Sequence, residues 1–79
     1  MMFYSFRSEP RMVVRYGPQG GPVWNYRGAL IETGSIKNGR ENYLRMKGHP
    51  ENGERFDYPM AIVEIVDWWI DEHQCGEAP

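Results

Sequence analysis

The chain has 79 residues, of which 41% are hydrophobic and 25% are charged, and its formal net charge is −2. This length leaves room for one domain, and a domain so short buries only about 60% of the surface that its unfolded chain exposes. Cys75 is the only cysteine, which excludes an intrachain disulfide and points to a reducing, cytoplasmic compartment. We therefore expect a single domain over residues 1–79, for which homodimerisation would be one way of gaining stability.

No targeting or membrane-spanning segment is predicted. The first residues lack a basic segment followed by a long apolar run, which a secretory signal would need. The longest apolar stretch, Met60–Ile70, is interrupted by Glu64 and Asp67, and it is shorter than the ~20 residues that span a bilayer. We therefore expect no membrane partner.

The first part of the chain predicts β-strands separated by turns. A short edge strand is expected at Phe3–Arg7, and a second strand at Arg11–Tyr16, where apolar residues alternate. The glycine- and proline-rich run Gly17–Pro22 predicts a connecting loop. Val23–Ile31 predicts one long strand, in which Gly28 marks a bulge or a close backbone approach.

The Asn38-Gly39 pair predicts a two-residue type I′ turn, because these residues readily take the two positive φ angles that this turn requires. The register that follows places an apolar pair on one face and an opposite-charge pair on the other, which supports it. It pairs Ile31 with Met46, Glu32 with Arg45 and Thr33 with Leu44.

The last part of the chain changes from strand to helical periodicity. Asn52-Gly53 predicts a second turn, followed by a strand over Glu54–Tyr58. Apolar residues at helical spacing predict a helix over about Pro59–Gln74, with the proline in the first turn and Gly76 after the end. A frayed tail is expected over 75–79. The predicted apolar stripe of this helix comprises Ile62, Ile65, Val66, Trp69 and His73, and the acidic residues Glu64, Asp67 and Asp71 are expected on the opposite face.

These elements predict an α+β fold, in which an antiparallel sheet of four or five strands packs against one C-terminal amphipathic helix. The strands are expected between about residues 3 and 58, and the helix between about 59 and 74. The predicted core comprises Val14, Leu44, Met46, Phe56, Ile62, Ile65, Val66 and Trp69.

The spacing of Trp24–Gly28, His49-Pro50 and Tyr58–Ala61 is similar to that in the plasmid-borne type B dihydrofolate reductases, which are short SH3-like barrels that assemble as tetramers. In that family a Val-Gln-Ile-Tyr run ahead of the proline forms the reductase site, and the matching run here is Arg55-Phe56-Asp57-Tyr58. Because the glutamine and the small apolar positions are absent, reductase activity is not implied. The resemblance implies a small SH3-like β-barrel as an alternative fold.

The charges divide sharply along the chain. Residues 1–50 carry eight lysines or arginines and three acidic residues, whereas residues 51–79 carry one arginine and eight acidic residues. The near-neutral total therefore hides a basic sheet half and an acidic helix half. Both halves can be ordinary solvated surface, or each can be a surface for a partner of opposite charge.

The first functional hypothesis is a small regulatory or inhibitory module, of the kind that phages and mobile elements encode, which binds a protein with a basic surface. The acidic helix face would carry this interaction, together with Trp68, because tryptophan is enriched at interfaces. Its alternative is that Trp68 covers the sheet edge of its own chain. The predicted partner-binding residues are Glu64, Asp67, Trp68, Asp71 and Glu72.

The second hypothesis is a nucleic-acid-binding module that uses the basic sheet face, where aromatic rings can stack on bases. The acidic half of the chain would oppose this, because it repels phosphate. The residues predicted for this alternative are Arg15, Arg27, Tyr43, Arg45 and Lys47.

Neither a catalytic set nor a cofactor or metal site is predicted. His73 and Cys75 are close in sequence, but a zinc site needs three or four ligands and no further pair completes one. The acidic residues around the second turn are typical of a wet turn, and the Gly17–Pro22 loop lacks the Lys-Ser/Thr ending of a phosphate loop. We therefore expect no enzyme activity.

Overall fold

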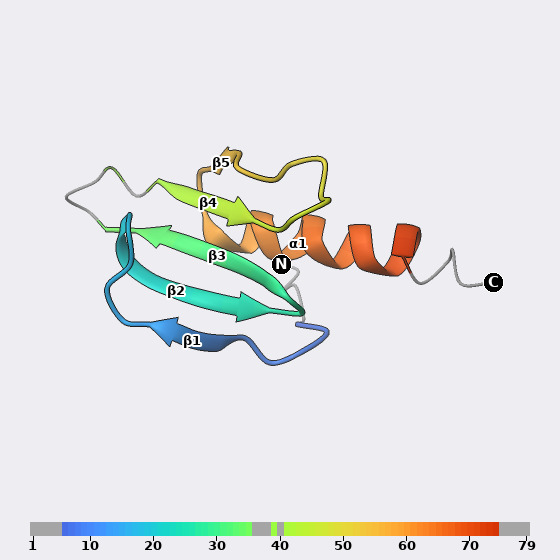
Figure 1. Ribbon diagram of the computed structural model, residues 1–79, viewed down its shortest axis with the longest axis horizontal. Coiled ribbons are helices and arrows are strands. Elements are labelled where there is room, and N and C mark those ends of the chain that lie inside the picture. Colours follow the sequence, from blue (N-terminus) through green and yellow to red (C-terminus); the bar gives the residue numbers. More distant parts are fainter. Residues whose placement is uncertain (1–5, 36–38, 40, 75–79) are drawn as a thin grey trace, which may run out of the picture.

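The computed structural model describes residues 6–35, 39 and 41–74 of the chain. Within them, five antiparallel strands form one open sheet in the order β1-β2-β3-β4-β5, and a helix packs on one face of it (Figure 1). The predicted α+β class is therefore confirmed. The elements are β1 (Arg11–Val14), β2 (Gly20–Tyr26), β3 (Ala29–Gly34), β4 (Asn42–Arg45), β5 (Arg55–Phe56), α1 (Pro59–Trp69) and a five-residue π-helix, η2 (Ile70–Gln74).

The prediction of one long strand over Val23–Ile31 is wrong, because the chain turns back at Arg27-Gly28. Tyr26 at the end of β2 pairs with Ala29 at the start of β3. The two residues between them have φ angles of 53° and 92°, and two positive φ angles are the signature of a type I′ turn. Gly28 is therefore the second central residue of a hairpin turn and not a bulge.

The predicted register between β3 and β4 is wrong by two residues. Ile31 lies opposite Leu44, and Glu32 lies opposite Tyr43. A slip of two residues keeps every side chain on its predicted face, since strand side chains alternate with a period of two. Ile31 and Leu44 therefore still face the core. The Asn38-Gly39 turn lies outside the described residues except for Gly39, which has a φ of 72°.

Several predicted boundaries shift. β1 ends at Val14 and β2 begins at Gly20, inside the predicted loop, while β5 keeps only two residues of the predicted Glu54–Tyr58 strand. The turn at Asn52-Gly53 is confirmed, with the Gly53 N–H donating to the Leu44 carbonyl at 2.7 Å. Phe6 and Arg7 lie outside any strand. The rest of the predicted first strand, Gly76 and the tail over 75–79 fall outside the described residues.

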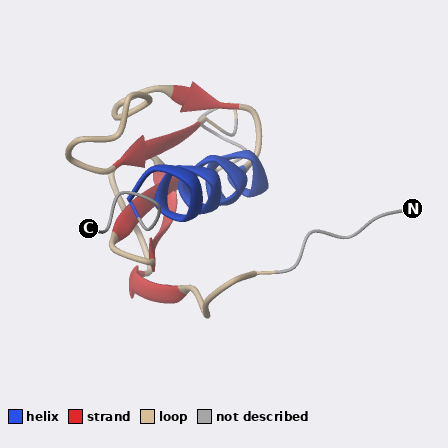
Figure 2. Cartoon of the chain, turned by 90° about the vertical axis from the view of Figure 1, so that its right-hand side faces the viewer, coloured by secondary structure: helices blue, strands red, loops and turns tan. Residues whose placement is uncertain are grey.

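The helix prediction over Pro59–Gln74 is confirmed, although its last five residues take π-helical geometry. Proline occupies the first turn of α1, where its missing N–H costs no hydrogen bond. Seen nearly along the helix axis, the strands curve around one side of α1 (Figure 2). The helix therefore has one flank against the sheet and another that remains open.

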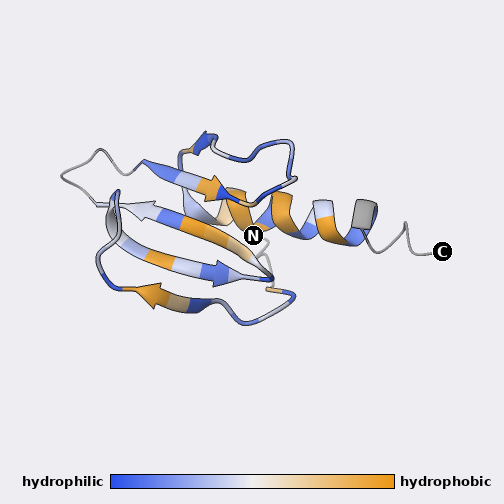
Figure 3. Ribbon diagram, viewed as in Figure 1, coloured by the Kyte–Doolittle hydropathy of each residue, from blue (hydrophilic) through white to orange (hydrophobic). Residues whose placement is uncertain are grey.

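The core lies between α1 and the sheet. Seven side chains in it are at most 3% exposed: Tyr26, Ala29, Ile31, Leu44, Ile62, Val63 and Val66. Of the remaining predicted core residues, Met46, Phe56 and Ile65 are partly buried against this cluster, and Trp69 is partly buried with its ring 5.2 Å from that of His49. The prediction for Val14 is wrong, because it is 44% exposed on the edge strand β1. Figure 3 shows how the hydrophobic colour continues along this exposed strand.

The hairpin turn gives a test of the backbone conformation at Gly28. A Cβ at this position would have no heavy atom within 4 Å, so only the left-handed φ should oppose a side chain. We expect Gly28→Ala to lower the free energy of unfolding by about 1–2 kcal/mol, and Gly28→Asn to lower it by less, since asparagine tolerates this region. Urea denaturation of both variants measures the difference, and an equal loss for the two would contradict the assignment.

Candidate functional site

The five helix residues predicted to bind a partner lie around one hollow beside the second half of α1. Its volume is about 610 Å³, and two arginines complete its wall. We call it the acidic hollow, because four carboxylates in its lining face two guanidinium groups. It is lined by Arg7, Arg27, Glu64, Asp67, Trp68, Asp71 and Glu72.

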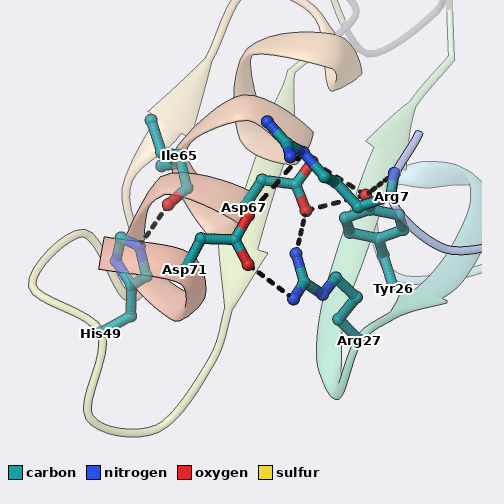
Figure 4. Close-up of polar contacts among 7 residues, drawn as sticks. All are labelled: Arg7, Tyr26, Arg27, His49, Ile65, Asp67 and Asp71. Carbon is teal, nitrogen blue, oxygen red and sulfur yellow. Dashed lines mark hydrogen bonds and ion pairs between the residues drawn. The ribbon is translucent and has the colours of Figure 1, made fainter. Parts of the chain in front are cut away.

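Asp67 is buried in the wall of this hollow, with 1% of its surface exposed. The Tyr26 hydroxyl lies 2.8 and 2.9 Å from its two carboxylate oxygens, and Arg27 Nη1 donates to Oδ1 at 2.6 Å (Figure 4). The prediction that Asp67 lies on the solvated helix face is therefore wrong. The buried arc of α1 extends through Val63, one turn before Asp67, and a wider apolar stripe that included Val63 would have indicated this. We call Tyr26, Arg27 and Asp67 the clamp.

Arg27 joins the hairpin turn to both ends of the acidic hollow. Besides its bond to Asp67, its Nη2 donates to Asp71 Oδ1 at 2.9 Å. Hydrogen bonds to Asp71 and Asp67 raise the pKa of Arg27 above its ordinary value. The same contact with Arg27 lowers the pKa of Asp71. The guanidinium group and the Asp71 carboxylate are therefore both charged at neutral pH.

The segment over residues 6–10, which we call the strap, is tied to the same cluster. The Arg7 backbone N–H donates to the Tyr26 hydroxyl at 2.9 Å, and Arg7 Nε lies 3.7 Å from Asp71 Oδ2. The Phe6 ring lies 5.9 Å from the Tyr26 ring. Burial and the hydrogen bond to Asp67 raise the pKa of Tyr26, so the tyrosine remains protonated and keeps its proton for the carboxylate.

Three of the predicted residues form the outer rim of the hollow. Glu64, Trp68 and Glu72 are spaced four residues apart, so they follow one another along the helix surface. All three are exposed, Trp68 to 53%. Among the described residues, neither glutamate takes part in an ion pair. The excess negative charge of the hollow is therefore concentrated on this rim.

The face of the sheet opposite the helix carries part of the predicted nucleic-acid set. Tyr43 and Arg45 point to this face, because Leu44 between them is fully buried on the helix side. The Arg45 guanidinium carbon lies 5.3 Å from the centre of the Tyr43 ring. Arg55, which the sequence did not single out, lies opposite Tyr43 in the β4–β5 register. Arg45 Nε also contacts Glu32 Oε1 at 3.1 Å.

The other predicted basic residues do not join this face as one patch. The placement of Arg27 there is wrong, because its side chain is paired with Asp67 and Asp71 beside the helix. Arg15 and Lys47 are exposed just beyond the ends of β1 and β4. The pattern of alternating residues could place Tyr43 and Arg45 correctly, but it could not find a hairpin turn at Arg27.

His49, 5% exposed, connects the loop after β4 to the helix. Its Nδ1 accepts a hydrogen bond from the Glu51 N–H at 2.9 Å, so Nε2 carries the proton and donates to the Ile65 carbonyl at 3.3 Å (Figure 4). This contact fixes the loop on α1. Among residues 6–35, 39 and 41–74, no three His, Cys, Asp or Glu side chains are grouped to hold a metal ion.

No protein-family model matches this chain, and no curated protein or solved structure is significantly similar to it. Within the part of the chain that the structure describes, none of the helices has the length and apolar character needed to cross a membrane.

The clamp gives a test of how far the fold depends on Asp67. Removing its charge leaves the largely buried Arg27 guanidinium without its closest partner, and breaking a buried ion pair in this way costs about 3–5 kcal/mol. We expect Asp67→Asn to lower the free energy of unfolding by about this amount, as measured by chemical denaturation. Asp71→Asn is the matched control, and it should cost clearly less because the Asp71 side chain is 30% exposed. Equal losses for the two variants would contradict the role of Asp67.

Proposed function

We propose that this chain is a small, non-catalytic regulatory or inhibitory module that binds a protein partner through the rim Glu64, Trp68 and Glu72. The observation that carries the proposal is an exposed tryptophan between two glutamates, neither of which has an ion pair among the described residues. The single cysteine supports action in a reducing, cytoplasmic compartment.

The chemistry of the rim favours a cationic partner group. The face of a tryptophan ring attracts arginine or lysine by about 0.5–2 kcal/mol, and a carboxylate on either side adds opposite charge at hydrogen-bonding range of the same cation. Complementary charge also steers association and speeds it at low salt. The partner surface that fits the rim therefore presents an arginine or lysine side chain.

The inner part of the hollow supports the rim without competing for the partner. Asp67 and Asp71 are already paired with arginines of the same chain. They hold α1 against the hairpin turn, so the positions of the rim residues are set before binding. Such preorganisation lowers the entropic cost of association.

The proposal is tested with a rhodamine-labelled nonapeptide that carries three arginines among glycine and serine, titrated with the full chain and followed by anisotropy. We expect Trp68→Ala and Glu64→Gln/Glu72→Gln each to weaken binding by about tenfold, which corresponds to about 1.4 kcal/mol. Added salt should weaken the wild-type complex by screening the rim.

Glu51→Gln/Glu54→Gln is the matched control, since it removes two exposed negative charges on the loop between β4 and β5. This variant should bind as the wild type does. An equal loss for both double variants would mean that the peptide senses net charge alone, and the absence of any binding at low salt would refute the proposal.

A second candidate function, binding of single-stranded nucleic acid, is favoured by the position of Tyr43 between Arg45 and Arg55 on the sheet face opposite α1. An aromatic ring flanked by cations can stack on a base while the cations contact phosphate, and each stacked base contributes about 1–3 kcal/mol.

This candidate predicts that a labelled single-stranded oligonucleotide binds at low salt, and that Tyr43→Ala weakens it by about tenfold or more. Tyr16→Ala removes an equally aromatic but more exposed side chain and should change little. Binding that is the same in both variants, or absent altogether, would leave the open face without this function.

A further inference from the structure

A second hollow lies beside the first half of α1, and its lining is almost entirely apolar. Its volume is about 400 Å³, within the range of ligand pockets. The sheet contributes Trp24 and Ile31, the helix contributes Met60 and Val63, and the strap contributes Phe6. We call it the apolar hollow. The charged group in its lining is Glu9.

The two hollows are continuous along one flank of the helix. Met60 in the apolar hollow is followed at four-residue intervals by Glu64, Trp68 and Glu72 in the acidic hollow, so these four side chains follow one helix row. On the strap, Phe6 lines the apolar hollow and its neighbour Arg7 lines the acidic one. One flank of α1 is therefore apolar along its first half and acidic along its second half.

We propose that this flank is a two-part groove for one segment of the protein partner, an inference that rests on the function proposed above. The segment would place a large apolar side chain, such as phenylalanine, in the apolar hollow and an arginine or lysine on the rim. The acidic half calls for positive charge, and the apolar half for a side chain that gains by leaving water.

The helix also sets the spacing of the two groups. Val63 and Glu72 are nine residues apart and Val63 and Trp68 are five, so at 1.5 Å per residue the two parts of the groove lie about 8–14 Å apart. An extended peptide advances about 3.3 Å per residue. The apolar residue and the basic residue should therefore be separated by about two to four residues of extended chain.

The experiment compares three rhodamine-labelled peptides of equal length on the full chain. The first carries arginines only, the second adds a phenylalanine three residues from the nearest arginine, and the third keeps the phenylalanine but has glutamine for each arginine. We expect the phenylalanine to tighten binding of the arginine peptide at least tenfold. Met60→Gln, which makes the apolar hollow polar, should remove this gain and leave the affinity of the arginine-only peptide unchanged.

Met46→Gln is the matched control, because Met46 is also a partly buried methionine against the core but does not line either hollow. It should keep the gain from phenylalanine. Thermal melts of both variants establish that they are folded at the temperature of the titration.

The possible failures are distinguishable. If the arginine peptide binds but phenylalanine adds nothing, the two-part groove is wrong while the proposed function stands. If neither arginine peptide binds, the proposed function itself fails. An equal loss of the gain in Met46→Gln would refute the assignment to the apolar hollow, as would sedimentation that shows a dimer dissociated by Met60→Gln, since a second copy would then cover the groove.

Discussion

A single buried carboxylate, that of Asp67, holds three separate parts of this small protein together. Removing a carboxylate from water costs several kcal/mol unless hydrogen bonds and an opposite charge compensate. Tyr26 from β2 and Arg27 from the hairpin turn supply both, and the Tyr26 hydroxyl also accepts the Arg7 N–H of the strap. Arg27 has a φ of 53°, a conformation that costs a residue with a Cβ about 1–2 kcal/mol. The charge-assisted bond to Asp67 offsets that cost, so the turn and the ion pair depend on each other.

The clamp also determines what the helix surface can offer to a partner. Asp67 and Asp71 are used within the chain, which leaves the excess charge on Glu64 and Glu72 at the rim. The strap, tied to Tyr26, contributes one residue to the apolar hollow and the next to the acidic hollow. The distance between the two hollows is therefore set by contacts of the core and does not depend on the conformation of exposed side chains.

Sequence periodicity was sufficient for the helix and for the face of each strand, because Ile62, Val66 and Leu44 occupy positions that only one face can bury. It failed where a tertiary contact decides the structure. Arg-Gly lacks the side-chain preference of Asn-Gly for two left-handed residues, so the turn at Arg27 depends on partners 40 and 44 residues away. Asp67 was expected in solvent for the same reason: its charge is compatible with burial only beside Arg27 and Tyr26. Glu64, Trp68 and Glu72 need no such partner, and their exposure was predicted correctly.

The two faces of the domain differ in what a partner would have to displace. On the open sheet face, Arg45 already contacts Glu32 and the Tyr43 ring, so a nucleic acid that uses them must first break these contacts. On the helix flank, the rim glutamates have no ion pair among the described residues, and the apolar hollow has walls held by the core. Binding there requires little reorganisation, and a surface that is set before binding retains more of its interaction energy as affinity. This difference favours the helix flank over the open sheet face as the partner-binding surface.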